Sequence, residues 1–219
     1  MVEAVIFDLD GVLLDSEQLW NEAKREVVEE TGGRWREDAP HAMMGMSSLE
    51  WSAYLRDALG VPLEAPQIDR SVVTRMEDLY RAHLPVLPGA VEAVRALRRR
   101  WVLGLASSSN REIIDLALSL AAIDDAFAVT ISSEEVACGK PAPDVYLEAA
   151  RRLGRDPRRC VAIEDSSNGL RSAVAAGMTV IAVPNPHYPP AEDALALAAH
   201  VVTTLHEVTP ALVERVSAG

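Results

Sequence analysis

The sequence predicts an α/β fold, a doubly wound parallel sheet with a Rossmann-like core and a small all-helical cap domain inserted after the first strand. Over most of the 219 residues, short apolar runs that favour strands alternate with amphipathic patterns that favour helices. One long stretch, residues 18–84, breaks this alternation, because it contains helical patterns and no convincing strand. We therefore assign residues 1–15 and 86–219 to the α/β core and residues 16–85 to the cap.

The first predicted strand ends at two aspartates. Ala4–Phe7 is a continuous apolar run with β-branched and aromatic residues, typical of a strand buried on both faces, and Gly11 interrupts the pattern. Asp8 and Asp10 therefore lie at the carboxyl end of a central strand, the edge at which open α/β sheets bind ligands. Two unpaired carboxylates there would repel each other unless a cation lies between them or one is protonated. On this motif alone, a helix-capping aspartate beside a solvated one is the simpler interpretation.

The cap region shows three helical stretches. Apolar residues recur at helical spacing at Leu19, Ala23, Val27 and Val28, then over Leu49–Leu59, then over Val72–Leu84. We interpret these stretches as an α-helical lid hinged near residues 14–17 and 84–88, because a connection of this length inside one βαβ unit far exceeds the usual crossover. The alternative is that these helices complete the outer layer of the core.

The rest of the chain supplies further strands and the helices between them. The strands are predicted at Val102–Ala106, Phe127–Ile131, Cys160–Ile163, Thr179–Val183 and His200–Thr203. One helix begins after Pro88-Gly89, and another is predicted at Ser109–Glu112, a segment with the form of a capping box. Gly154 and Gly177 are predicted to end two later helices.

Further polar residues stand in or beside the later apolar runs. Ser107 follows the second strand, Glu164 and Asp165 follow the fourth, and Lys140 lies in a proline-containing loop before a helix. Each has an ordinary structural explanation when it is taken alone. Ser107 could cap a helix, Lys140 could be a solvated charge, and the acidic pair could be a helix amino terminus favoured by the helix dipole.

Taken together and in chain order, these residues resemble the four motifs of the haloacid dehalogenase superfamily of phosphotransferases. The resemblance is closest to its β-phosphoglucomutase-like and sugar-phosphate phosphatase branch, in Phe7–Val12 with Asp15–Glu17, Gly139–Pro141 with Pro143-Asp144, and Ile163–Ser166 with Gly169. It covers nearly the whole chain outside residues 18–84. That branch carries a four-helix cap after the first strand, which is the position of the helical stretches here.

The resemblance implies a role for each motif residue. Asp8 would attack phosphorus to form an aspartyl-phosphate, and Asp10 would protonate the leaving oxygen and then deprotonate water. Asp8, the backbone carbonyl of Asp10 and Asp165 would bind Mg²⁺, with Glu164 binding through water or orienting the site. The groups that hold the phosphoryl oxygens would be the Ser107 hydroxyl, the Ser108 amide and Lys140.

The predicted reaction is Mg²⁺-dependent hydrolysis of a small phosphorylated metabolite, a sugar or sugar-alcohol monophosphate. The related mutases use a lid histidine near Trp20 and basic residues in the loop corresponding to Met43–Ser48, and this sequence has neither. A mutase must also hold a bisphosphate intermediate, which calls for a second cationic phosphate site. The candidate substrate contacts are Glu17, Trp20, Gly45, Met46 and Asn110.

Other functions remain as alternatives. A β-phosphoglucomutase-type mutase would be favoured if lid arginines point into the cleft, the candidates being Arg34, Arg36, Arg70 and Arg75. A non-catalytic binding protein on the same scaffold is disfavoured, because a candidate is present for every motif. A haloacid dehalogenase proper would share the nucleophile but would not need the acid–base residue Asp10.

Composition is consistent with an intracellular enzyme. The net charge of −12 argues against nucleic acid or an anionic membrane as a partner, since both require basic surface. An acidic protein that binds phosphate esters must make its site locally positive, which a divalent metal and Lys140 would do. Two cysteines give no disulfide framework, and the amino terminus lacks a signal-peptide pattern. We expect a cytoplasmic protein that is a monomer or a weak homodimer.

Overall fold

A computed structural model describes residues 1–43 and 46–217. Within these residues, a six-stranded parallel sheet has the order β3-β2-β1-β4-β5-β6. The strands are β1 Ala4–Phe7, β2 Val102–Ser107, β3 Val129–Ser132, β4 Cys160–Glu164, β5 Thr179–Ala182 and β6 His200–Val201. Phe7 pairs with Leu105 of β2 and with Ile163 of β4, so the polar residues that follow these strands emerge side by side. The predicted α/β class with a parallel, Rossmann-like sheet is confirmed.

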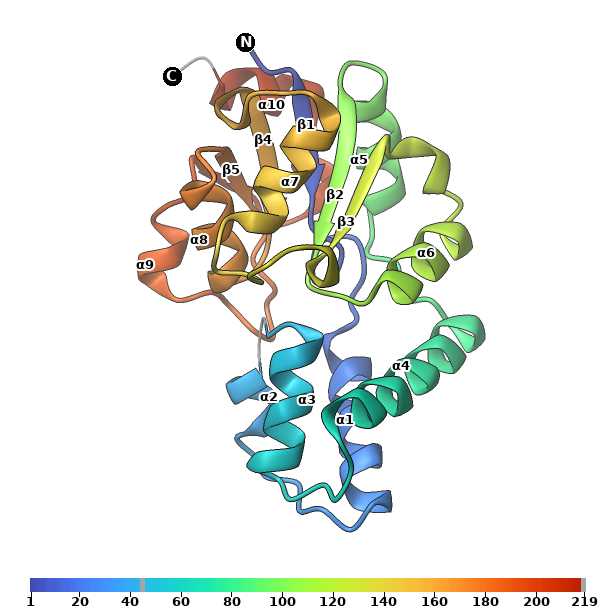
Figure 1. The fold of residues 1–219 in the computed structure, drawn as a ribbon. Helices are drawn as coiled ribbons and strands as arrows, with labels where there is room; N and C mark the ends of the chain where they lie inside the picture. The colour runs from blue at the N-terminus through green and yellow to red at the C-terminus, as the bar shows by residue number, and fades with distance from the viewer. Residues whose placement is uncertain (44–45, 218–219) are drawn as a thin grey trace.

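Helices cover both faces of the sheet, as Figure 1 shows. They are α5 Ala90–Arg98, α6 Arg111–Leu120, α7 Asp144–Leu153, α8 Ser167–Ala175, α9 Glu192–Leu195 and α10 Pro210–Val216, with 3₁₀ turns η1 Asp124–Ala126, η2 Ser133–Glu135, η3 Pro157–Arg159 and η4 Leu205–Glu207. Side chains of β1 alternate between two apolar clusters, because successive strand residues point to opposite faces. Val5 and Phe7 belong to the cluster that contains α5 and α6 residues, whereas Ile6 packs with α7 and α8.

Four of the described helices lie between β1 and α5. They are α1 Glu17–Glu30, α2 Ala39–Met43, α3 Ser48–Asp57 and α4 Ala65–Ala82. They gather below the sheet in Figure 1, with α1 and α3 packed on α4. The two chain connections to the core lie together, because the Asp15 amide donates to the Pro85 carbonyl over 2.8 Å and Leu14 bridges Val86. The boundaries 15/16 and 85/86 stay a prediction.

Several details differ from the sequence predictions. The strand β3 begins at Val129, because Phe127 instead packs edge-on against Phe7, with ring centroids 6.0 Å apart. The short helix α2 was not predicted.

Gly154 ends α7 in the left-handed conformation, as expected. Among the described residues, no helix combines the length and apolar character that crossing a membrane requires.

The predicted capping box at Ser109–Glu112 is wrong. The helix α6 begins at Arg111 with Asn110 as its N-cap, and the Asn110 side chain makes no capping hydrogen bond. The Arg111 amide donates instead to Glu134 Oε2 over 2.9 Å. The Ser109 hydroxyl is thereby free to donate to Asp10.

Candidate active site

A buried charge cluster lies at the carboxyl ends of β1 and β4. Lys140, from the loop before α7, places its Nζ 2.9 Å from Asp8 Oδ1 and 2.6 Å from Glu164 Oε1. Carboxylate oxygens of Asp8, Glu164 and Asp165 all lie within 4.8 Å of one another, and all three residues are buried. The structure therefore brings together residues from three separated segments of the chain.

Glu164 has its hydrogen-bonding capacity filled by the protein. Its Oε1 accepts from Lys140 and from the Tyr146 hydroxyl at 2.9 Å, and its Oε2 accepts from the backbone amides of Asp165 and Ser166. A Cβ atom on Gly169 would lie 1.8 Å from Glu164 Oε1, so only glycine leaves room for this carboxylate. Glu164 thus holds Lys140 in place and fixes the turn that leads into α8.

The carboxylates of this cluster are under electrostatic strain. Burial raises the pKa of Asp8 to about 8, with Glu164 and Asp10 adding to the rise and Lys140 opposing it. Burial, with Glu164 and Asp8, also raises the pKa of Asp165 well above its ordinary value. Burial disfavours the charged form of Lys140, yet Asp8 and Glu164 outweigh it and raise the pKa of this lysine, which stays protonated.

A divalent cation fits this donor set. Asp165 Oδ1 is buried and has no hydrogen-bond partner, and the three acidic groups outnumber the single lysine. Carboxylate oxygens are the ligands that hard divalent cations prefer, and a cation would lower the raised pKa values. Gly11 has a φ of +80°, and a Cβ atom there would lie 2.0 Å from Asp165 Oδ2. The glycine therefore permits the carboxylate of Asp165 to approach the first loop.

The Asp10 side chain turns away from the cluster toward the cap. Its Oδ1 accepts from the Ser16 hydroxyl and from Trp20 Nε1 at 3.1 Å, with the Tyr80 hydroxyl 3.5 Å away. Its Oδ2 accepts from the Ser109 hydroxyl at 2.6 Å. One carboxylate thus contacts the N-cap residue of α1, the helices α1 and α4, and the loop after β2.

Hydrogen bonds from residues at the end of β3 hold the loop that follows β2. Ser107 Oγ accepts from the Ser109 amide at 3.0 Å and lies 3.5 Å from Asp10 Oδ2, while Ser108 is half-buried at the cavity. The hydroxyls of Ser132 and Ser133 donate to the Ser109 and Ser108 carbonyls over 2.7 Å and 2.9 Å. The end of β3 thereby fixes the backbone of the loop.

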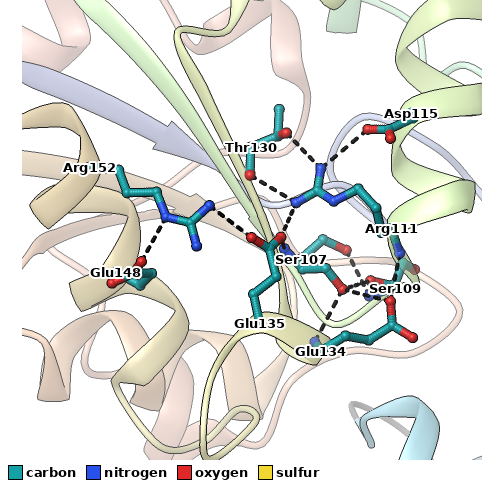
Figure 2. Close-up of polar contacts among 10 residues, drawn as sticks. Ser107, Ser109, Arg111, Asp115, Thr130, Glu134, Glu135, Glu148 and Arg152 are labelled. Atoms are coloured by element: carbon teal, nitrogen blue, oxygen red, sulfur yellow. Dashed lines mark hydrogen bonds and ion pairs between the residues drawn. The ribbon is translucent and has the colours of Figure 1, made fainter.

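Figure 2 shows the ionic network beside this loop. The Arg111 guanidinium donates to Thr130 and pairs with Glu135, and Glu135 in turn pairs with Arg152 at 2.8 Å. Arg152 also pairs with Glu148 at 2.6 Å. Because these side chains are partly exposed, each pair adds little stability, about 0–1 kcal/mol. Together these pairs link α6, α7 and the residues at the end of β3. The helix α6 begins directly after the loop that follows β2.

A small cavity lies between Asp10 and the cap. Its volume is about 60 Å³, and its lining includes Glu17, Trp20 and Met46 of the predicted substrate contacts together with Ser108. Gly45 lies outside the described residues. Asn110 does not face this cavity, because its amide nitrogen donates to Asp69 of α4 and to Glu134 of η2, at 3.0 and 2.9 Å.

Sequence reasoning missed Lys24, which also lines the cavity. Lys24 is buried on α1, and its Nζ lies 5.4 Å from the centre of the Trp20 ring and 5.2 Å from that of Trp51. Burial lowers the pKa of Lys24 to about 8, although Glu17 and Asp10 oppose the shift. A signal was present, since Lys24 stands four residues after Trp20, on the apolar face of α1 that also carries Val27.

The lid arginines considered for a mutase lie elsewhere. Arg36 pairs with Asp38, Arg75 with Glu30, and Arg70 with Glu112 of α6 at 3.4 Å. These pairs are partly or largely exposed to solvent.

Comparison with known proteins is consistent with this geometry. Hexitol phosphatase B of Escherichia coli K12 is 37% identical over 189 residues, which cover 84% of each chain. A phosphorylated carbohydrates phosphatase of Thermotoga maritima is 34% identical over 81% of this chain and 82% of its own. The crystal structure of CbbY from Rhodobacter sphaeroides in complex with phosphate has a TM-score of 0.88 at 29% identity, covering 98% of this chain and 100% of that one. A family model described as haloacid dehalogenase-like hydrolase matches residues 2–177, and the chain belongs to this family.

Proposed function

We propose that this protein is a Mg²⁺-dependent phosphatase that hydrolyses small phosphorylated metabolites, sugar or sugar-alcohol monophosphates, through an aspartyl-phosphate on Asp8. The observation that carries the proposal is the position of Asp8, ion-paired with Lys140 and close to the unpartnered Asp165 oxygen, two residues before Asp10, which lines the cavity. The relatives named as phosphatases of hexitol phosphates and phosphorylated carbohydrates support the same substrate class. We place the activity in the cytoplasm, in a monomer or weak homodimer.

Asp8 and Asp10 have different roles in the proposed reaction. A carboxylate oxygen of Asp8 forms a bond to phosphorus while the bond from phosphorus to the alcohol oxygen breaks, and Asp10, as the general acid, gives a proton to that oxygen. Asp10 then accepts a proton from water, whose oxygen attacks phosphorus and breaks the bond to Asp8. Inorganic phosphate leaves, and both aspartates return to their starting states.

Lys140 and Ser107 have donors left for the phosphoryl group. An ammonium has three N–H donors, and Lys140 directs two toward Asp8 and Glu164, so one remains for a phosphoryl oxygen. Ser107 Oγ accepts from Ser109 and makes only a 3.5 Å contact to Asp10, so its O–H can turn to the same group. We assign Glu164 to orienting Lys140 rather than to metal binding, because its oxygens are already occupied.

The metal would be held by the carboxylates of Asp8 and Asp165 and by the backbone carbonyl of Asp10. When bound, Mg²⁺ would neutralise charge on the phosphoryl oxygens. It commonly takes only a few protein ligands and keeps several waters, in agreement with the small number of free oxygens in this cluster.

Hydrolysis is favoured over a mutase reaction by the charges around the cavity. Among the described residues that line it, Lys24 is the basic one, and it faces Glu17 and Asp10. A second phosphate carries close to two negative charges, which one lysine between two carboxylates does not balance. Water therefore hydrolyses the aspartyl-phosphate.

The nucleophile is tested by the Asp8→Asn variant. Because an amide cannot form the acyl phosphate, we expect turnover to fall by at least about a hundredfold while the protein stays folded. Steady-state phosphate release and circular dichroism measure the two quantities. A rate equal to that of the wild type would rule out the covalent route.

Metal dependence is tested by chelation. We expect EDTA to abolish phosphate release, Mg²⁺ to restore it, and Ca²⁺ to inhibit it, because Ca²⁺ is larger and adopts irregular higher coordination. Full activity in the chelator would contradict the proposed metal site.

The space beside Asp165 is tested by a matched pair of glycine variants. Gly11→Ala and Gly32→Ala both place a side chain at a positive φ, +80° and +86°, but only the first meets Asp165, since nothing lies within 4 Å at Gly32. Both should lose about 1–2 kcal/mol of stability because of the positive φ, and Gly11→Ala should lose more because of the contact with Asp165. Only Gly11→Ala should also lose turnover and the rise in melting temperature on adding Mg²⁺. Equal effects of the two variants on Mg²⁺ binding would show that Asp165 does not need this space.

Phosphorus NMR separates the phosphatase from the mutase. With sugar monophosphates, we expect inorganic phosphate to accumulate in step with substrate loss, with little positional isomer and no stimulation by a sugar bisphosphate. The physical reason is the lack of a second cationic phosphate site in the described cavity lining. Conversion of a 1-phosphate to its 6-phosphate faster than phosphate release would identify a mutase instead.

A further inference from the structure

Lys24 is a buried residue whose ammonium group, at the cavity, has no hydrogen-bond or ion-pair partner among the described residues. The chain has only two lysines, and both are buried at the candidate active site. Lys140 is satisfied by two carboxylates, whereas Lys24 Nζ makes no hydrogen bond or ion pair with any described residue and lies against two indole rings. Burying a charge without hydrogen-bond partners is costly, and cation–π contacts recover only about 0.5–2 kcal/mol. A ligand atom in the cavity would supply the missing acceptor.

The neighbouring groups restrict what that ligand atom can be. Glu17 lines the same cavity and stands seven residues before Lys24, two turns earlier on the same face of α1. Glu17 and Asp10 are also the carboxylates that act on the Lys24 charge. An anionic group at this place would meet one cation and two acids. A hydroxyl group accepts from an ammonium and donates to a carboxylate, so it satisfies Lys24 and Glu17 together.

The aromatic walls agree with a polyol chain. Trp20 and Trp51 have ring centroids 6.3 Å apart and planes tilted by 54°, and they present apolar surface beside the two charged groups. A carbon chain with a hydroxyl on each carbon offers C–H groups to such rings and hydroxyls to the polar atoms. Trp20 also donates to Asp10, so the walls of the cavity are continuous with the acid–base residue.

We propose that Lys24 and Glu17 form a donor–acceptor pair that binds the hydroxyl groups of the substrate far from its phosphate, and that this pair selects neutral polyol phosphates over phosphorylated acids. The inference rests on the proposed phosphatase function and names the part of the chain that sets substrate preference. It assigns Lys24 to substrate binding and leaves the covalent chemistry to Asp8 and Asp10.

The test compares Lys24→Met with Arg25→Met. Methionine keeps the length of the side chain and removes the charge, and Arg25 is the next residue of the same helix but is exposed. The substrates are sorbitol 6-phosphate, its terminal acid analogue 6-phosphogluconate, and p-nitrophenyl phosphate, which has no hydroxyl chain. KM and kcat are measured for each, together with the melting temperature.

The wild type should prefer sorbitol 6-phosphate to 6-phosphogluconate. Lys24→Met should lower kcat/KM for sorbitol 6-phosphate, mainly through KM, by about tenfold more than for p-nitrophenyl phosphate, since an uncharged side chain cannot bind the hydroxyl. Its melting temperature should not fall, because an apolar side chain replaces an unpaired buried charge. Arg25→Met should resemble the wild type in every measurement.

Other outcomes overturn the inference in distinct ways. Equal losses on all three substrates with a lower melting temperature would make Lys24 structural. A wild-type preference for 6-phosphogluconate that Lys24→Met removes would show that the lysine binds an anion. Unchanged kinetics of Lys24→Met on sorbitol 6-phosphate would remove it from substrate binding. If the wild type hydrolysed none of the three, the proposed function itself would fail.

Discussion

The structure of the site depends on one buried interaction, the ammonium of Lys140 held between Asp8 and Glu164. All three groups are buried, and removing one partner of a buried pair costs about 3–5 kcal/mol because it leaves a charge uncompensated. Neighbouring groups stabilise this arrangement. Tyr146 and two backbone amides satisfy Glu164, and the missing side chain of Gly169 leaves space for it. Asp8 is thereby held at the end of β1 in a fixed position.

Asp10 is held in a different manner from Asp8, although only one residue separates them. Asp8 faces a charged cluster in the core, whereas Asp10 accepts hydrogen bonds from neutral donors. Three of these donors, Ser16, Trp20 and Tyr80, belong to residues 16–85. Because these donors come from a segment joined to the core by paired connections, the position of Asp10 depends on how the cap helices meet the loop after β2. Asp8, the proposed nucleophile, is thus held by the core, and Asp10, the proposed acid–base residue, by the contact between the core and the helices that follow β1.

The sequence predicted the parallel sheet and the residues at its strand ends, because an apolar run and the polar residue that ends it are local features. It could not predict partners that are distant along the chain. The Ser109 hydroxyl was assigned to a capping box, but tertiary contact turns it to Asp10, 99 positions earlier. The contact of Asn110, a predicted substrate residue, with Asp69 of α4 could not be foreseen either. Lys24 was missed because only the apolar positions of its helix were considered.

Charge placement reconciles an acidic protein with an anionic substrate. The chain carries a net charge of −12, yet both of its lysines are buried at the site, and lid arginines such as Arg36 and Arg75 are paired with surface carboxylates. A buried cation acts through a lower dielectric than an exposed one, so its field is stronger at short range and is screened less by salt. A buried lysine such as Lys140 can therefore do at this site what a broad basic surface does in other anion-binding proteins. Lys140 lies against Asp8 and Glu164 in the core, whereas Lys24 lines the cavity on the side formed by α1, so the two buried positive charges act at different parts of the site.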